Sequence, residues 1–167
     1  MEISLKSMIL LGSVLITGLS AGLFYAWSVS VIPGTQKVTD QVYLETMQSI
    51  NRAILNPAFF LVFFGSVLML GFSSIYGYQS GNLIFGFMLS AFACYFIGTV
   101  AVTGLGNVPL NDQLDALKLD QLALEEAGKF RKYYESRWNR LHQIRTAFAV
   151  LSFVLVTIGS LIQSQKL

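Results

Sequence analysis

Three long stretches without a charged residue dominate the pattern of hydrophobic and polar positions in this chain. No Asp, Glu, Lys or Arg lies between Ser7 and Gln36, between Ala53 and Asn111, or between Thr146 and Gln165. A helix of roughly 20 mainly apolar residues crosses a bilayer, and the middle stretch is long enough for two such helices. The pattern therefore predicts one domain over residues 1–167 with four spans, at about 8–32, 57–77, 83–104 and 146–163.

The polar segments between the spans are also helical in pattern. In the first connection, apolar residues at positions 43, 47, 50 and 54 fall on one face of a helix. The third connection, residues 112–145, is polar and helical, and Gly128 is expected to mark a bend in it. Pro33-Gly34 is expected to stop the first span, and the Gly and Pro residues of 104–111 to end the third. The predicted fold class is all-α: a four-helix transmembrane bundle with additional amphipathic helices in the first and third connections.

Composition agrees with this class and limits the chemistry. The chain is 54% hydrophobic and 12% charged, with mean hydropathy +0.60, whereas soluble domains carry about 25% charged residues. Cys94 is the single cysteine and His142 the single histidine. These counts exclude an internal disulfide, a bis-histidine haem and a three-histidine zinc site. We therefore expect no metal site and no bound cofactor.

The distribution of basic residues predicts an orientation and narrows the partners. Of 11 Lys and Arg residues, only Lys6 and Lys166 lie at the end of the bundle that carries the termini. The positive-inside rule then places the long connections in the cytoplasm and both termini on the opposite side.

Interleaved acidic residues in the third connection argue against a nucleic-acid partner. Gly18 and Gly22 form a small-xxx-small pair, which allows close helix packing and makes a homo-oligomer one candidate partner besides the lipid bilayer.

Polar side chains gather next to the apolar runs in three segments, which are expected to meet on one side of the membrane. The segment before the fourth span has Trp138, Asn139, His142 and Arg145; the other two contain Asn51-Arg52 and Asn107 to Asn111. Structural roles stay open for all of them. Arg at the end of a span usually reaches the phosphate layer, a lone His is often a satisfied interfacial group, and Asn often caps or bridges helices.

The same segments carry a resemblance to a known family. Residues 21–34 (AGLFYAWSVSVIPG), 47–57 (MQSINRAILNP) and 106–111 (GNVPLN), together with Trp138-Asn139 and Arg145-Thr146, are similar in order and spacing to the anthrone oxygenase-like family. This is a group of small four-helix membrane proteins. The resemblance implies a monooxygenase that oxidises an apolar anthrone or quinone-like molecule with dioxygen, without a cofactor.

Chemistry and position suggest roles for the polar residues in such a reaction. An anthrone has an acidic CH2, so the site needs a base, groups that stabilise the enolate oxygen, and a dry aromatic pocket. His142 is the candidate base, and Arg145 and Arg52 are the candidate stabilising cations. The expected substrate-binding residues are Asn51, Asn107, Asn111, Trp138, Asn139, Tyr25 and Trp27. The alternative is a non-catalytic membrane protein that binds a small apolar ligand or serves as an accessory subunit.

Overall fold

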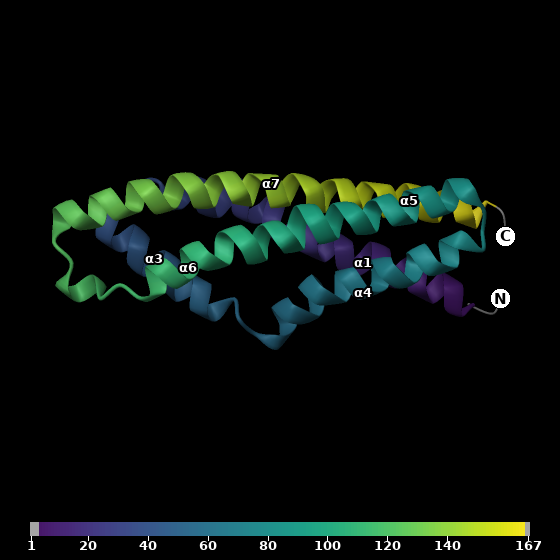
Figure 1. Ribbon diagram of the computed structural model, residues 1–167, viewed down its shortest axis with the longest axis horizontal. Helices are drawn as coiled ribbons and strands as arrows, with labels where there is room; N and C mark the ends of the chain where they lie inside the picture. Colours follow the sequence, from purple (N-terminus) through teal and green to yellow (C-terminus); the bar gives the residue numbers. More distant parts are fainter. Residues whose placement is uncertain (1–3, 166–167) are drawn as a thin grey trace.

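The computed structural model describes residues 4–165 as a bundle dominated by four long helices, with the two ends of the chain at the same end of the molecule (Figure 1). Lys166, which the predicted orientation included, lies outside the described residues. All four long helices are apolar and long enough to cross a membrane. The predicted all-α fold class is confirmed, and the chain is a multi-pass integral membrane protein. The four are Leu5–Thr35, Pro57–Tyr78, Asn82–Asp115 and Leu124–Ser164.

Two of the long helices are built from consecutive pieces. The first long helix (Leu5–Thr35) consists of α1 (Leu5–Ala26), the π-helix η1 (Trp27–Val31) and α2 (Ile32–Thr35). The third long helix (Asn82–Asp115) consists of α5 (Asn82–Ala93), the π-helices η2 (Cys94–Ala101) and η3 (Thr103–Asn107), and α6 (Val108–Asp115). The other elements are α3 (Asp40–Ala53), α4 (Pro57–Tyr78), the 3-10 turn η4 (Leu119–Gln121) and α7 (Leu124–Ser164).

Large apolar side chains lie on the outer face of the bundle, and small polar side chains lie between its helices. Leucines such as Leu11, Leu15 and Leu19 are more than half exposed on its outer face, as a lipid environment permits. Small hydroxyl residues are buried between the helices: Ser13 and Ser73 hydrogen-bond at 2.7 Å between α1 and α4. Small polar residues at helix interfaces allow close approach and give interhelical hydrogen bonds in hydrocarbon.

The sequence-based prediction that Gly and Pro end the first and third spans is wrong. Both helices continue through Pro33 and Pro109, to Thr35 and Asp115 respectively. In each case a π-helix, η1 or η3, lies immediately before the short α-helix that contains the proline. A proline inside an α-helix loses one hydrogen bond and clashes with the carbonyl four residues earlier. The i→i−5 bonding of the wider turn shifts these carbonyls, which lets the helix run on.

The expected bend at Gly128 is also absent. Gly128 lies in the second turn of α7, which runs uninterrupted for 41 residues. Its lack of a side chain serves packing instead, because a Cβ there would lie 2.9 Å from the Asp40 carboxylate. In the predicted Gly18/Gly22 pair, a Cβ on Gly18 would meet Phe153 of α7 at 3.0 Å, while Gly22 faces open space.

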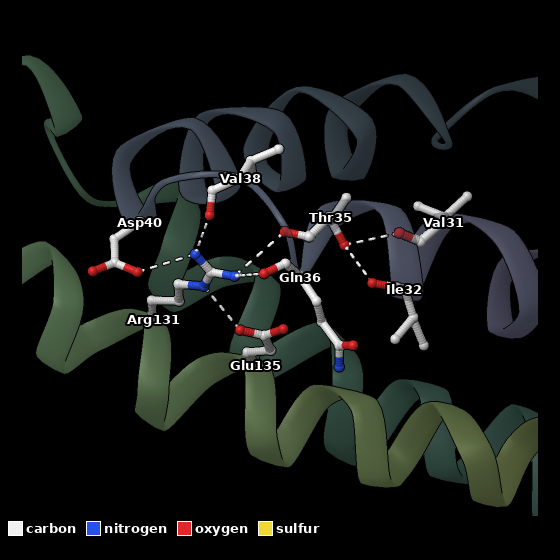
Figure 2. A network of polar contacts seen from close by, with 8 residues as sticks. All are labelled: Val31, Ile32, Thr35, Gln36, Val38, Asp40, Arg131 and Glu135. Carbon is white, nitrogen blue, oxygen red and sulfur yellow. Dashed lines mark hydrogen bonds and ion pairs between the residues drawn. The ribbon is translucent and has the colours of Figure 1, made fainter.

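Arg131 of α7 fastens the first connection to the fourth long helix (Figure 2). Its guanidinium donates to the carbonyl oxygens of Thr35, Gln36 and Val38 and pairs with Asp40 at 3.0 Å and Glu135 at 2.9 Å. These carbonyls lie at the last residue of the first long helix and just beyond it, where backbone acceptors have no partner within the helix. The Arg131 clamp therefore fixes the start of α3 against α7.

Tyr43 of α3 lies under this clamp. The Arg131 guanidinium is 4.5 Å from the centroid of its ring, and the side chain is almost completely buried. Burial raises the pKa of the Tyr43 phenol well above its ordinary value, and the nearby Glu135 adds to the effect. The phenol therefore stays neutral, and the clamp carries α3 and its Asn51 to a fixed place beside α7.

Candidate functional site

A cavity of about 310 Å³ lies where the apolar half of the bundle meets the polar half. It is lined by the end of α1, η1, the end of α3 and the residues that follow it, the first two turns of α4, the third long helix and the middle of α7. Its walls are mainly aromatic and aliphatic, and the volume is at the lower end of the range for small-molecule sites. The aromatic lining residues are Phe24, Trp27, Phe59, Phe60, Phe63, Phe64 and Trp138.

A chain of hydrogen bonds among α3, α6 and α7 forms the polar end of this cavity. Asn51 donates its amide to the Tyr134 hydroxyl at 3.1 Å, which in turn donates to Oδ1 of Asn111 at 3.1 Å. The same oxygen accepts from the indole Nε1 of Trp138 at 2.9 Å. Asn107 is buried one turn before Asn111 and donates to the Trp138 carbonyl at 3.3 Å. The three polar segments of the sequence thus meet at one place.

Arg145 brings a buried positive charge to the cavity. It is 8% exposed and lines the cavity, and among residues 4–165 no carboxylate forms an ion pair with it. Its guanidinium lies 4.8 Å from the ring centroid of Phe24 and 5.0 Å from that of Trp138. It donates to Thr103 Oγ1 at 3.4 Å. A buried charge is costly unless it is paired, so this cation could stabilise a negative charge inside the cavity.

His142 contacts Arg145, and this contact defines the tautomer of the His142 imidazole. Nε and Nη2 of Arg145 lie 3.2 and 3.0 Å from His142 Nδ1. A guanidinium can only donate, so Nδ1 is the acceptor and the proton is on Nε2. Nε2 then donates to the Phe24 carbonyl at 3.1 Å, with Ser28 Oγ also within 3.0 Å. The imidazole is neutral, fully buried and stacked on Trp138 with an interplanar angle of 7°.

The structure gathers six of the ten predicted site residues around the cavity and places four elsewhere. Trp27, Asn51, Asn111, Trp138, His142 and Arg145 line it. Asn107 is buried behind the lining and bonds to the Trp138 backbone. Arg52 is exposed and pairs with Asp115 at 2.6 Å. Tyr25 is 58% exposed on the outer surface, and the half-buried Asn139 is outside the lining.

Two buried polar atoms near this site have no hydrogen-bond partner among residues 4–165. They are the indole Nε1 of Trp27 and Oδ1 of Asn107. In the same described range, no group of three or more His, Cys, Asp and Glu side chains could hold a metal ion. The chemistry available is therefore that of one cation, one neutral imidazole, amide groups and aromatic surface.

Sequence reasoning missed several residues of the site, and one of them, Tyr134, which lies behind the cavity lining, had a usable signal. Tyr134 links Asn51 to Asn111, and it lies four residues before Trp138 on the face that leads to Arg145, so this helical stripe indicates it. Phe59 and Phe63 were assigned to a span, and apolar composition alone does not separate lipid-facing from cavity-facing rings. Thr103, which accepts from Arg145, had no signal in the sequence.

Fold and site together define a class: a four-span membrane protein with an aromatic cavity and a buried, carboxylate-free arginine. Comparison with protein families then gives a match to the anthrone oxygenase family over residues 50–155, more than half of the 167 residues. The chain belongs to this family. The matched region contains Asn51, Asn111, His142 and Arg145, and begins after Trp27. Searches of curated proteins and of solved structures gave no significant match.

Proposed function

We propose that the cavity binds a planar, apolar aromatic ketone with an acidic CH2, an anthrone, and oxidises it with dioxygen to the quinone without a cofactor. The observation that carries this proposal is the buried Arg145 guanidinium beside an aromatic cavity, with no carboxylate partner among residues 4–165. A fixed cation in a dry site stabilises developing oxyanion charge far more than one in water does. The enolate oxygen of an anthrone is such an anion.

The lining of the cavity supports this choice of substrate. Its walls provide ring surfaces from Phe24, Phe63 and Trp138, which suit a flat polycyclic molecule. Asn111 and Asn51 fix the polar end, and Arg145 faces the oxygen. Polar residues in the lining (Asn51, Thr103, Asn111, His142 and Arg145), with aromatic rings elsewhere, would orient a molecule that has its oxygen on one edge.

His142 supplies the proton acceptor in this proposal. When Arg145 turns from His142 Nδ1 to the substrate oxygen, that nitrogen regains a free lone pair and takes one proton from the CH2. The enolate carbon then passes one electron to dioxygen, and the two radicals join to form a C–O bond. The His142 imidazolium returns its proton to the peroxide, which gives a hydroperoxide and the neutral imidazole. His142 Nδ1 then takes the second C–H proton, and the O–O bond breaks as the C=O bond forms. One oxygen remains as the new carbonyl; the other leaves as hydroxide and takes the proton from His142 to become water. Dioxygen is the oxidant, and the CH2 carbon is oxidised by four electrons.

The test is quinone formation by purified protein in lipid nanodiscs. Anthrone is added in air-saturated buffer and quinone absorbance is followed against empty nanodiscs. R145Q is expected to lower the catalysed rate by about 10²–10³-fold, the effect of removing an oxyanion donor. R140Q, which removes an exposed arginine from the same helix, should leave the rate unchanged. R145K tests whether any cation suffices.

A catalysed rate that R145Q does not change, in a variant that melts like the wild type, refutes the proposed mechanism. A second candidate function is ligand binding without catalysis, which is favoured by the contact of Arg145 with His142 Nδ1 because this contact occupies the lone pair of the base. It predicts binding of the anthrone with no quinone above the empty-nanodisc rate.

We also propose that the long connections lie in the cytoplasm and both termini on the opposite side. Support comes from the basic residues of the connections, which exceed those near the chain ends by nine to two (11 − 2 = 9). In a C94A background, a cysteine at Lys118 should be protected from a membrane-impermeant maleimide in intact cells, and one at Ser164 should react. The opposite labelling pattern overturns this orientation.

A further inference from the structure

The cavity is not closed on all sides, because several of its lining residues are also on the outer surface. Phe60 and Phe64 of α4 are 38% and 49% exposed, and Val108 of α6 is 41% exposed. Gly104 of η3 is also exposed and lines the cavity. Two of these residues are on α4 and two on the third long helix. Leu55, just before α4, also lines the cavity and is 65% exposed, and Leu23 of α1 is 38% exposed. Most of the exposed lining therefore lies along the start of α4 and the third long helix.

The packing of α4 deeper in the bundle supports this location. Gly71 packs against Phe92 of α5, where an added Cβ would lie 3.7 Å from the ring. Phe64 precedes Gly71 by seven residues and Phe60 by eleven, which places all three on one face of α4. The face that packs on the third long helix near Gly71 therefore borders the cavity at Phe60 and Phe64. In Figure 1, α4 begins near the middle of the molecule, while the third long helix continues past it.

The surroundings of the opening are uncharged and apolar, as expected of a surface that faces hydrocarbon. The chain has no charged residue between Ala53 and Asn111, which includes Phe60, Phe64, Gly104 and Val108. Apolar side chains beside it are among the most exposed of the protein: Leu61 is 69% exposed and Leu105 84%. Exposed apolar surface of this kind on a membrane-spanning helix contacts lipid.

Gly104 keeps this opening clear. A Cβ at this position would meet no atom within 4 Å, so the absence of a side chain is not needed for helix packing. Gly86 of the same long helix is also exposed and has the same free space. The difference is position, because Gly104 lines the cavity and Gly86 does not.

We propose that the cavity opens sideways into the bilayer between α4 and the third long helix, and that its ligand enters from the hydrocarbon layer past Gly104. The identity of the ligand, a planar apolar aromatic, rests on the proposed function; the route does not. A substrate of this kind concentrates in lipid, and the lateral opening lets it reach Arg145 without crossing the polar half of the protein.

Tryptophan fluorescence tests the route without any reaction. The chain has two tryptophans, Trp27 and Trp138, and both line the cavity. The probe is 9-bromoanthracene, a planar heavy-atom quencher without an acidic CH2, mixed into nanodiscs in a stopped-flow instrument. In the wild type, the quenching rate should rise with the mole fraction of probe in the lipid. G104F should slow quenching by roughly tenfold, within the range by which association rates vary among variants of one site.

G86F is the matched control, since it adds the same ring to the same long helix away from the opening, and it should quench like the wild type. V108F is a second plug, to be used if G104F does not fold, and it should slow quenching in the same way. Equal rates in a folded plug variant and in G86F overturn the proposed route. Failure of the proposed function would instead appear as absent quinone formation with the quenching difference intact.

Discussion

Gly98 offers the sharpest test of the helix packing around Arg145. It lies in η2, and a Cβ at this position would be 2.0 Å from Cγ and 2.4 Å from Cβ of Phe148 on α7. Ordinary contact begins at 3.4 Å, so G98A requires a separation of about 1.4 Å (3.4 − 2.0) between the two helices. Overpacking of this kind costs about 1–3 kcal/mol, against a gain of up to about 1 kcal/mol from replacing Gly by Ala in a helix.

G86A is the reference variant, because Gly86 has open space around it and its replacement by Ala gains only the helix propensity. Comparing G98A with G86A therefore cancels this gain and leaves the cost of overpacking. We expect G98A to be about 1–3 kcal/mol less stable than G86A, or about 2–12 °C lower in Tm for a chain of this size. The assay is thermal unfolding in one detergent, followed by circular dichroism. Phe148→Ala should not restore G98A fully, because the Phe148 Cβ is itself too close.

Moving η2 away from α7 should also disturb the site around Arg145. Thr99, the neighbour of Gly98, donates to the Arg145 carbonyl at 3.2 Å, so moving η2 moves a support of Arg145. A Tm for G98A equal to or above that of G86A would refute the close approach of η2 and α7.

Three further substitutions test the remaining polar contacts. R131A should cost about 3 kcal/mol, because it leaves three backbone carbonyls and the carboxylates of Asp40 and Glu135 without their cation. K132A, at an exposed position, should change Tm little, and faster proteolysis at residues 35–40 in R131A alone is the expected readout. N111A leaves two buried donors without their acceptor and should cost about 1–3 kcal/mol, with a shifted tryptophan emission, whereas N139A should not shift it. R52A breaks an ion pair whose side chains are 62% and 53% exposed, so the free energy of unfolding should fall by less than about 1 kcal/mol. A larger fall that persists in high salt contradicts a solvent-exposed Arg52–Asp115 pair.

The membrane architecture could be predicted because the bilayer limits the length and composition of a spanning helix, and both can be seen in the sequence. A span needs a charge-free run of sufficient length, and the runs after Ser7, Ala53 and Thr146 satisfy it. The helix ends were less accessible. Pro33 and Pro109 carry the usual signals for a break, but the π-helices before them absorb the proline, and this change of hydrogen-bond register has no simple sequence pattern.

The candidate site was partly predictable for a related reason. Polar residues at span ends are few, so Asn51, Asn111 and Arg145 stand out. The sequence could not separate Arg145 from Arg52, since each comes shortly before a charge-free apolar run. In the structure, Arg145 is buried against aromatic rings, and Arg52 is paired with Asp115 at the surface. That distinction depends on which helix faces turn inward, which is set by tertiary packing.

The unbroken length of α7 has a consequence for how sequences of this family can diverge. Arg131 and Arg145 lie on the same helix, 14 positions apart (145 − 131), and contact different partners with fixed directions. Each residue turns an α-helix by about 100°, so one inserted residue between them would rotate the clamp away from the first connection. Insertions of 7 or 11 residues return to within about 20° of the original direction but move Arg131 by about 10–16 Å along the helix axis, which also breaks its contacts with the first connection. We therefore expect the Arg131–Arg145 spacing in relatives to be constant.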